Sequence, residues 1–439
     1  MAATEAAARE LPDAVTEDIL LRLDAGADVV RASATCRAYR RVACDLSFLR
    51  RVRLRPPHPP PVLGAFVAEP LLGDGGGTAG SRFHPAAPPH PSVSAALTVA
   101  RAADLAFSFL PDPAGGAWRV RDVRDGRVLL SRSLRRAGAG AAAAGNNSDD
   151  FVVCDPLHRR YVQIPHVPDG LADSPRRYGA LELELFLAPA AADSALQVIA
   201  NALCARKMET LVFSSATGEW RHAAMFNFNG GRYARIRDPA SFVRHYANGC
   251  FYWTHHNRDA IIVLDTRTME FSFSTVYRPS ALRLPECRRR QSLAVVGAGG
   301  DGEPCLVAVV GIRMSVYWLQ SVYYGTWRHE KTILLPEGYH WYVMGASEGV
   351  LLLRGRHSQS EETADSQYFT MDLQTWSLEW MCTTDHTIML NHLYAKHPPP
   401  LSPPSISDGE KHTCWFSLLL AVSFYFTYIY CHLFSLSAV

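Results

Sequence analysis

The sequence predicts a multidomain chain of the α+β class, with a small unit of three helices, an all-β repeat domain and a C-terminal hydrophobic segment. Three observations support this. Apolar residues follow a helical period before residue 53, strand-like alternation with a recurring turn fills the middle, and the last 26 residues contain no Asp, Glu, Lys or Arg. The expected divisions are a disordered 1–10, helices in 11–52, a Pro/Gly-rich linker at 53–92, the β domain at 93–396, a linker at 397–412 and the hydrophobic tail at 413–439.

The first unit follows from apolar spacing. Val15, Ile19, Leu20 and Leu23 share one face of a helix that begins after Pro12 with Asp13 as a capping candidate. Gly26 breaks this helix, and Asp28 can cap a second one that runs through Cys36 and Tyr39 to Val42. Asp45 opens a short third helix with Phe48, Leu49 and Val52 inward. Three short helices form a marginal core, so we expect a partner to cover the apolar stripe.

The β domain follows from a recurring block of strand, Asp or Ser, turn and strand. Its markers are at intervals of 51 to 59 residues, and they are Asp155, Ser214, Asp265, Ser321 and Asp372. An all-strand unit of this length predicts a β-propeller of about six blades. The alternative is a large sandwich with similar hairpins. We expect helical periodicity in the stretch Ser194–Arg206, and a left-handed turn residue at Gly218.

The linkers and the tail follow from composition. Stretches rich in Pro, Gly and Ala begin at Pro56, Gly73, His84 and Arg136, and we expect them to lack a fixed conformation. The uncharged segment Cys414–Val439 is long enough to cross a bilayer as a helix. It predicts a tail anchor. The alternative is that it replaces a usual propeller ending through splicing or a gene-model error, which would leave the last blade with an exposed edge.

Charge and cysteine content narrow the function classes. The 439 residues carry a net charge of +2 and are 48% hydrophobic, which excludes wholesale disorder and gives no reason to expect a nucleic-acid partner. The basic runs Arg50–Arg55 and Arg288–Arg290 are interpreted as solvated faces, with nuclear import as the alternative. Ten cysteines without a C-x-x-C pair, and no apolar leader, indicate the cytoplasm or nucleus.

Catalytic and metal motifs have little support. Gly345–Gly349 fits the G-x-S-x-G nucleophile elbow, but the residues around Ser347 predict strand, turn and strand instead of strand, turn and helix. His255 and His256 have no third ligand nearby in the sequence, and no glycine-rich phosphate loop occurs. We therefore expect no enzyme activity, no metal and no cofactor. Trp220, Trp253, Trp327 and Trp376 are expected to pack between blades.

The N-terminal unit resembles an F-box, the adaptor-binding module of Skp–cullin–F-box ubiquitin ligases. The matching segments are L-P-D-A-V-T-E-D-I-L-L-R-L from Leu11, V-V-R-A-S-A-T-C-R-A-Y-R-R-V from Val29 and D-L-S-F-L from Asp45, with Tyr39 where the family usually has Trp. The resemblance implies that the residues meeting a Skp-type adaptor are Leu11, Pro12, Ile19, Leu20, Leu23, Val29 and Val30.

The repeat domain resembles the F-box-associated β-propeller of plant F-box proteins. The segments that carry this resemblance are S-S-A-T-G-E-W, N-G-C-F-Y-W and V-L-D-T-R-T-M-E-F-S. Together the two resemblances imply a non-catalytic substrate-recognition subunit of a ubiquitin ligase, bound through its adaptor to a cullin and through its propeller to a target protein. The alternative is a membrane-tethered propeller scaffold that binds protein or glycan without ubiquitin function.

Overall fold

The computed structural model describes most of the chain between residues 11 and 406. The described residues are 11–23, 26–45, 47–49, 51, 60–68, 82–111, 117–133, 149–168, 182–189, 195–203, 207–227, 242–255, 260–275, 293–298, 303–321, 326–347, 349–359, 365–385, 388–396 and 404–406. The hydrophobic tail from Cys414 lies outside them, as does the basic run Arg288–Arg290. No helix within the described ranges is long and apolar enough to cross a membrane.

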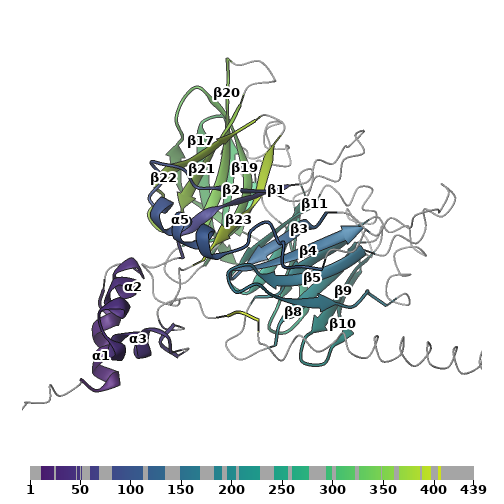
Figure 1. Ribbon diagram of the computed structural model, residues 1–439. Coiled ribbons are helices and arrows are strands. Elements are labelled where there is room, and N and C mark those ends of the chain that lie inside the picture. The colour runs from purple at the N-terminus through teal and green to yellow at the C-terminus, as the bar shows by residue number, and fades with distance from the viewer. Residues whose placement is uncertain are drawn as a thin grey trace, which may run out of the picture.

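The N-terminal helices form one group, labelled α1, α2 and α3 in Figure 1. Their bounds are Asp13–Leu21, Gly26–Thr35 and Arg37–Ala43, and residues 47–49 are also helical. The group has its own apolar core, formed by Leu20, Leu21, Val29, Val42, Ala43, Phe48 and Leu49. The inward positions expected for Phe48 and Leu49 are therefore confirmed, and Val52 lies outside the described residues.

The expected second helix is wrong in one respect, because it is two helices. Cys36 takes an extended conformation between α2 and α3, and its Sγ accepts a hydrogen bond from the Tyr39 N–H. The three-to-four spacing continues across this break, so apolar periodicity alone could not detect it. Asp13 also does not cap α1, because it is the first residue of the helix and Pro12 occupies the N-cap position; the Asp13 carboxylate instead pairs with Arg41 of α3 at 2.5 Å. Asp45 accepts hydrogen bonds from the Ser47 and Phe48 N–H groups, as a capping residue would.

The β domain contains five four-stranded units of antiparallel hairpins. We name them units I to V in chain order. Unit I contains β3 (Arg119–Arg124), β4 (Arg127–Ser133), β5 (Asp149–Asp155) and β6 (Arg160–Ile164). Unit II contains β7 (Glu182–Leu187), β8 (Gln197–Leu203), β9 (Lys207–Ser214) and β10 (Glu219–Asn227). Unit III contains β11 (Phe242–Ala247), β12 (Cys250–His255), β13 (Ala260–Asp265) and β14 (Glu270–Thr275).

Units IV and V repeat the pattern. Unit IV contains β15 (Leu293–Ala298), β16 (Glu303–Val310), β17 (Arg313–Ser321) and β18 (Thr326–Leu334). Unit V contains β19 (Tyr339–Ser347), β20 (Val350–His357), β21 (Ser366–Asp372) and β22 (Leu378–Thr384). A single parallel pair, Tyr246 with Val296, joins β11 of unit III to β15 of unit IV in one eight-stranded sheet. No sheet closes on itself within the described strands.

Unit VI combines the two ends of the β domain. β1 (Val62–Ala68) pairs with β2 (Phe83–Pro85) and with β23 (Met389–Ala395), and Figure 1 shows these three strands together. Residues 53–92, expected to be a linker, thus contain two strands of the β domain. Among the described residues, the edge strand β2 is short and ends in Pro85, which has no N–H to offer a further strand. The predicted exposed edge is therefore a poor template for strand pairing.

Six apolar clusters connect these units in sequence. Five of them join each unit to the next, and the sixth joins unit VI back to unit I. The sixth also includes helix α5 (Val93–Ala102), which lies where the sequence predicts strands. The helical expectation for Ser194–Arg206 is wrong, because its residues 197–203 form β8. Both faces of β8 are buried, so its apolar residues do not alternate and the strand signal is lost.

The repeated markers occupy equivalent places. Asp155, Ser214, Asp265, Ser321 and Asp372 each end the third strand of a unit, as the repeat predicts. Gly218 has the expected positive φ of 71°, four residues after its marker. At the same offset the other units place three residues with a side chain in the left-handed region, namely Arg159, Met269 and Trp376. The repeat is therefore conserved in backbone geometry more closely than in residue type.

Candidate functional site

Helix α1 has an exposed apolar face beside its buried one. Leu20 is 1% exposed and packs into the helical core, whereas Leu11, Val15 and Ile19 are 47%, 44% and 38% exposed. Val15 and Ile19 are four residues apart in α1, the spacing that places side chains on one face of a helix, and Leu11 lies two residues before the helix begins. We call Leu11, Val15 and Ile19 the α1 stripe. Exposed apolar side chains grouped in this way are a feature of protein interaction surfaces.

The structure divides the predicted adaptor-binding residues between surface and core. Leu11, Pro12 and Ile19 are exposed, Leu23 is half-buried, and Leu20 and Val29 are each 1% exposed inside the core. Val30 lies in α2, but its side chain is outside the described part of the structure. Val15 was not among the predicted contacts, although the four-residue spacing from Leu11 to Ile19 includes it. Contact of these residues with an adaptor stays a prediction.

A pocket of about 260 Å³ lies beside the start of the α1 stripe. It is lined by Leu11, Thr16, Cys36, Arg37, Ala38 and Tyr39. The break between α2 and α3 places Cys36 and the first residues of α3 opposite the start of α1. This pocket was not predictable from the sequence, because the continuous helix that the apolar spacing predicts has no turn at Cys36.

A group of ionised side chains connects the first strands of three units. Arg244 of β11 contacts Glu184 of β7 at 2.7 Å and Asp122 of β3 at 3.5 Å. Burial raises the pKa of Asp122, but Arg244, Arg124 and the Leu187 N–H outweigh burial and hold that pKa below its ordinary value. These opposite charges neutralise one another across units I, II and III. The group therefore has the character of a structural ion-pair network.

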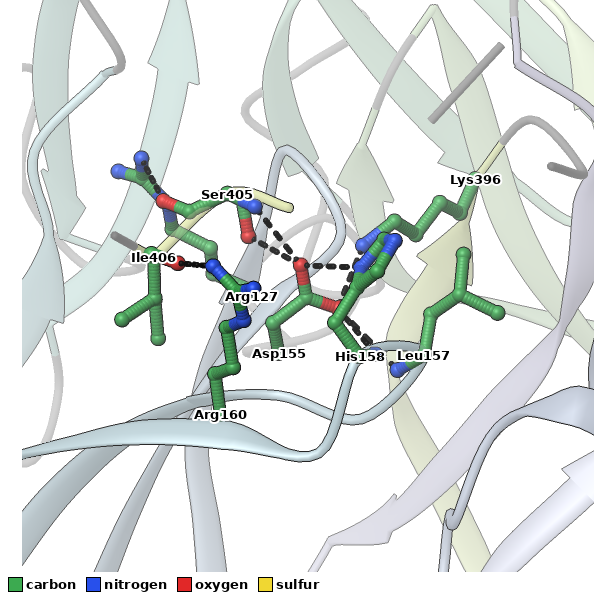
Figure 2. Close-up of polar contacts among 8 residues, drawn as sticks. All are labelled: Arg127, Asp155, Leu157, His158, Arg160, Lys396, Ser405 and Ile406. Atoms are coloured by element: carbon green, nitrogen blue, oxygen red, sulfur yellow. Dashed lines mark hydrogen bonds and ion pairs between the residues drawn. The ribbon is translucent and has the colours of Figure 1, made fainter. Parts of the chain in front are cut away.

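A second polar cluster holds the end of the β domain on unit I (Figure 2). Asp155 is fully buried and contacts the Lys396 Nζ at 2.7 Å. It also accepts hydrogen bonds from the Ser405 N–H at 2.9 Å and the Ser405 hydroxyl at 2.7 Å, and contacts His158 Nδ1 at 3.1 Å. Arg127 and Arg160 donate to the carbonyls of Ser405 and Ile406. We call these residues the Asp155 cluster.

The charge state of Asp155 follows from this environment. Burial raises the pKa of its carboxyl, but hydrogen bonds from His158 and Ser405 and the charge of Lys396 outweigh burial and hold the pKa well below its ordinary range. Ser405 donates to the carboxylate and not to an imidazole, so the arrangement differs from a Ser–His–Asp triad. The cluster joins residues some 240 positions apart, which the sequence could not indicate.

The remaining motifs take the places that the sequence predicts or fall outside the described residues. Ser347 pairs with Val350 in the β19–β20 hairpin, which confirms strand, turn and strand around the G-x-S-x-G motif. The His255 side chain and His256 lie outside the described part, within which no three His, Cys, Asp or Glu side chains could hold a metal ion. The four tryptophans pack as predicted, and they are Trp220, Trp253, Trp327 and Trp376.

Comparison with protein families gives two matches. Residues 8–55 match the family described as F-box-like, and residues 119–379 match the family described as F-box protein AT5G49610-like, beta-propeller. No curated protein matches the sequence.

Two solved structures show a distant similarity to this chain. An oligogalacturonate lyase in complex with manganese is 13% identical, with 60% of this chain covered and a TM-score of 0.31, and the chain spans 65% of the length of that lyase. A putative 6-phosphogluconolactonase from Bacteroides uniformis is 12% identical over 74% of this chain and 83% of its own, with a TM-score of 0.34. At these scores the likeness carries no argument about function.

Proposed function

Because the chain belongs to the family of F-box proteins with an AT5G49610-like β-propeller, we propose that it is the substrate-recognition subunit of a Skp–cullin–F-box ubiquitin ligase. The helices α1 to α3 bind a Skp-type adaptor and through it a cullin. The β domain, with units I to VI as six blades, holds a target protein. The chain itself brings the target close to the ubiquitin-carrying enzyme, and the bond-forming chemistry belongs to its partners.

The α1 stripe is the observation that carries this proposal. Leu11, Val15 and Ile19 are exposed, and they are not members of the apolar core that the described residues of the three helices form. Covering a large aliphatic side chain contributes about 1.5 to 3 kcal/mol when the whole side chain leaves water. Three residues that are already half-covered can together contribute a few kcal/mol. This is the scale of a small set of interface residues that dominates binding.

The compartment proposed for this complex is the cytoplasm or the nucleus. The cysteines of the described residues are free thiols, and Cys154, Cys305 and Cys382 are buried among apolar side chains. Burial raises the pKa of the Cys305 and Cys382 thiols to about 12, which keeps them protonated and unreactive. Buried unreactive thiols fit a reducing compartment.

Binding of the full-length chain to a Skp-type adaptor tests the proposal. Ile19→Asp places a charge in the α1 stripe and should weaken binding at least about 30-fold, because a carboxylate buried against an apolar partner has no counter-charge. Leu97→Asp is the matched control, since Leu97 is 53% exposed on helix α5, away from the F-box. Leu20→Asp would be uninformative because Leu20 lies in the core. Absence of binding by the wild type, or equal binding by Ile19→Asp and Leu97→Asp, would contradict the proposal.

A further inference from the structure

The arginines of the F-box differ in how they are neutralised. Four of them form ion pairs with acids of the same module, and these pairs are Arg22–Asp18, Arg31–Asp28, Arg41–Asp13 and Arg51–Glu17. Arg40 donates to the Ser33 carbonyl from α3. Arg37 has neither an ion-pair partner nor a hydrogen bond among the described residues, and it is exposed.

Arg37 also lies at a particular place. It lines the pocket between the start of α1 and the start of α3, where the other lining groups include the apolar side chains of Leu11, Ala38 and Tyr39. Leu11 belongs both to this pocket and to the α1 stripe. A partner that covers the stripe therefore passes beside the Arg37 guanidinium. The other described arginines of the module already have an ion-pair or hydrogen-bond partner within it.

We propose that Arg37 binds a carboxylate of the Skp-type adaptor, on a segment whose adjacent apolar side chain fills the pocket beside Leu11 and Tyr39. This inference rests on the proposed function and specifies the partner's chemistry at that surface. A guanidinium at the edge of an apolar pocket favours an Asp or Glu flanked by an apolar residue and disfavours a basic segment. Burial of the pocket by the partner also lowers the local dielectric, which strengthens this ion pair relative to one in open solvent.

Two variants of the full-length chain isolate this contact. Arg37→Gln removes the unpaired charge, and Arg31→Gln removes one equal charge that is already paired with Asp28. At low salt, about 50 mM, Arg37→Gln should weaken adaptor binding about fivefold and Arg31→Gln by less than twofold. The difference should shrink at about 500 mM salt, where exposed ion pairs are screened. Arg37→Glu should be rescued by an adaptor in which one Asp or Glu is replaced by Lys, whereas Arg31→Glu should not be.

The outcomes separate this inference from the proposed function. If the wild type binds and Ile19→Asp does not, equal affinities of Arg37→Gln and Arg31→Gln would overturn the Arg37 contact and leave the adaptor role standing. Weaker binding by Arg37→Gln without salt dependence and without charge-swap rescue would also overturn it. If the wild type fails to bind any Skp-type adaptor, the proposed function fails, and the Arg37 contact fails with it.

Discussion

Replacing Asp155 by Asn tests whether the Asp155 cluster fixes the end of the β domain. Asn has nearly the same shape but no charge, so it removes the carboxylate that pairs with Lys396, whose side chain is 5% exposed. Breaking a buried ion pair by removing one partner costs about 3 to 5 kcal/mol. Asn also presents N–H groups to donors such as Ser405. Weaker binding of Ser405 would loosen Ile406, which is fully buried between units I and II. We expect a loss of about 4 kcal/mol in the free energy of unfolding.

The assay is urea unfolding followed by tryptophan fluorescence, with Asp372→Asn as the matched control. Asp372 is the equivalent marker of unit V and accepts hydrogen bonds from the Gln374 and Thr375 N–H groups, but it is half-exposed and forms no ion pair with a described cation. Its replacement should cost about 1 kcal/mol. In addition, Lys396→Met should partly rescue Asp155→Asn, because the buried ammonium that lost the Asp155 carboxylate is then gone as well. Equal costs for Asp155→Asn and Asp372→Asn would refute the reasoning.

The pH dependence of the same variant gives a second check. The pKa of Asp155 lies below its ordinary value in the folded chain, so the stability from its charge is fully present above the unfolded pKa near 4. It is lost as pH falls further, because the unfolded chain takes up the proton first. The difference in stability between wild type and Asp155→Asn should therefore narrow below about pH 4. A constant difference would contradict the assignment of the effect to charge.

Three further perturbations follow from the structure. Arg244→Met removes the cation that contacts Glu184 and the buried Asp122, and it should cost about 3 kcal/mol in thermal or urea unfolding. Arg267→Met, whose side chain is 76% exposed, should cost less than about 1 kcal/mol. Equal costs would contradict a role for Arg244 in joining units I to III. Burial lowers the pKa of His392 to about 4, so the folded chain resists a proton that the unfolded chain binds near pH 6.5. Stability should therefore fall by about 2 kcal/mol between pH 7 and pH 5, and His392→Gln should flatten that fall in melting temperature; an unchanged slope would refute the assignment. A Cβ at Gly64 would lie 2.1 Å from the His84 carbonyl oxygen, so Gly64→Ala should lower the free energy of unfolding by more than about 3 kcal/mol. Gly338→Ala should lower it by about 1 kcal/mol, because a Cβ there meets open space at a φ of 86°. Similar melting temperatures for the two variants would show that β1 and β2 separate without penalty.

Local patterns in the sequence predicted the elements that depend on local physics. The helical spacing from Val15 to Leu23 and the capping of residues 47–49 by Asp45 involve neighbours within one or two turns. The Asp and Ser markers also act locally, since Asp265 accepts a hydrogen bond from the N–H two residues ahead. Each unit therefore carries its own turn signal, and the repeat was visible without the structure.

Two predictions failed because the sequence pattern that would have corrected them is absent: β8 is buried on both faces, and the break at Cys36 leaves the apolar spacing intact. β8 has no alternation because units I and III cover its two sides, and it therefore read as a helix. The α2–α3 break keeps the apolar spacing on both sides of an extended Cys36. Residues 82–92 read as a linker by composition, yet hydrogen bonds fix them to unrelated strands, including the Ala87 N–H to the Met381 carbonyl. The composition of a segment indicates how much apolar surface it can bury, but it does not indicate which distant strands will accept its hydrogen bonds.

The sequence by itself determined the two modules, their order and the repeated hairpin, because each depends on residues that are close along the chain. Only the tertiary structure decided that β1 pairs with β23, that Asp155 meets Lys396 and Ser405, and that Leu20 turns inward while Val15 and Ile19 stay exposed. These contacts join residues up to 333 positions apart, as in the pair Val62 and Ala395, or depend on how three helices pack. Spacing along the sequence determines which residues share a helix face, whereas the neighbouring helices determine which of the faces is buried.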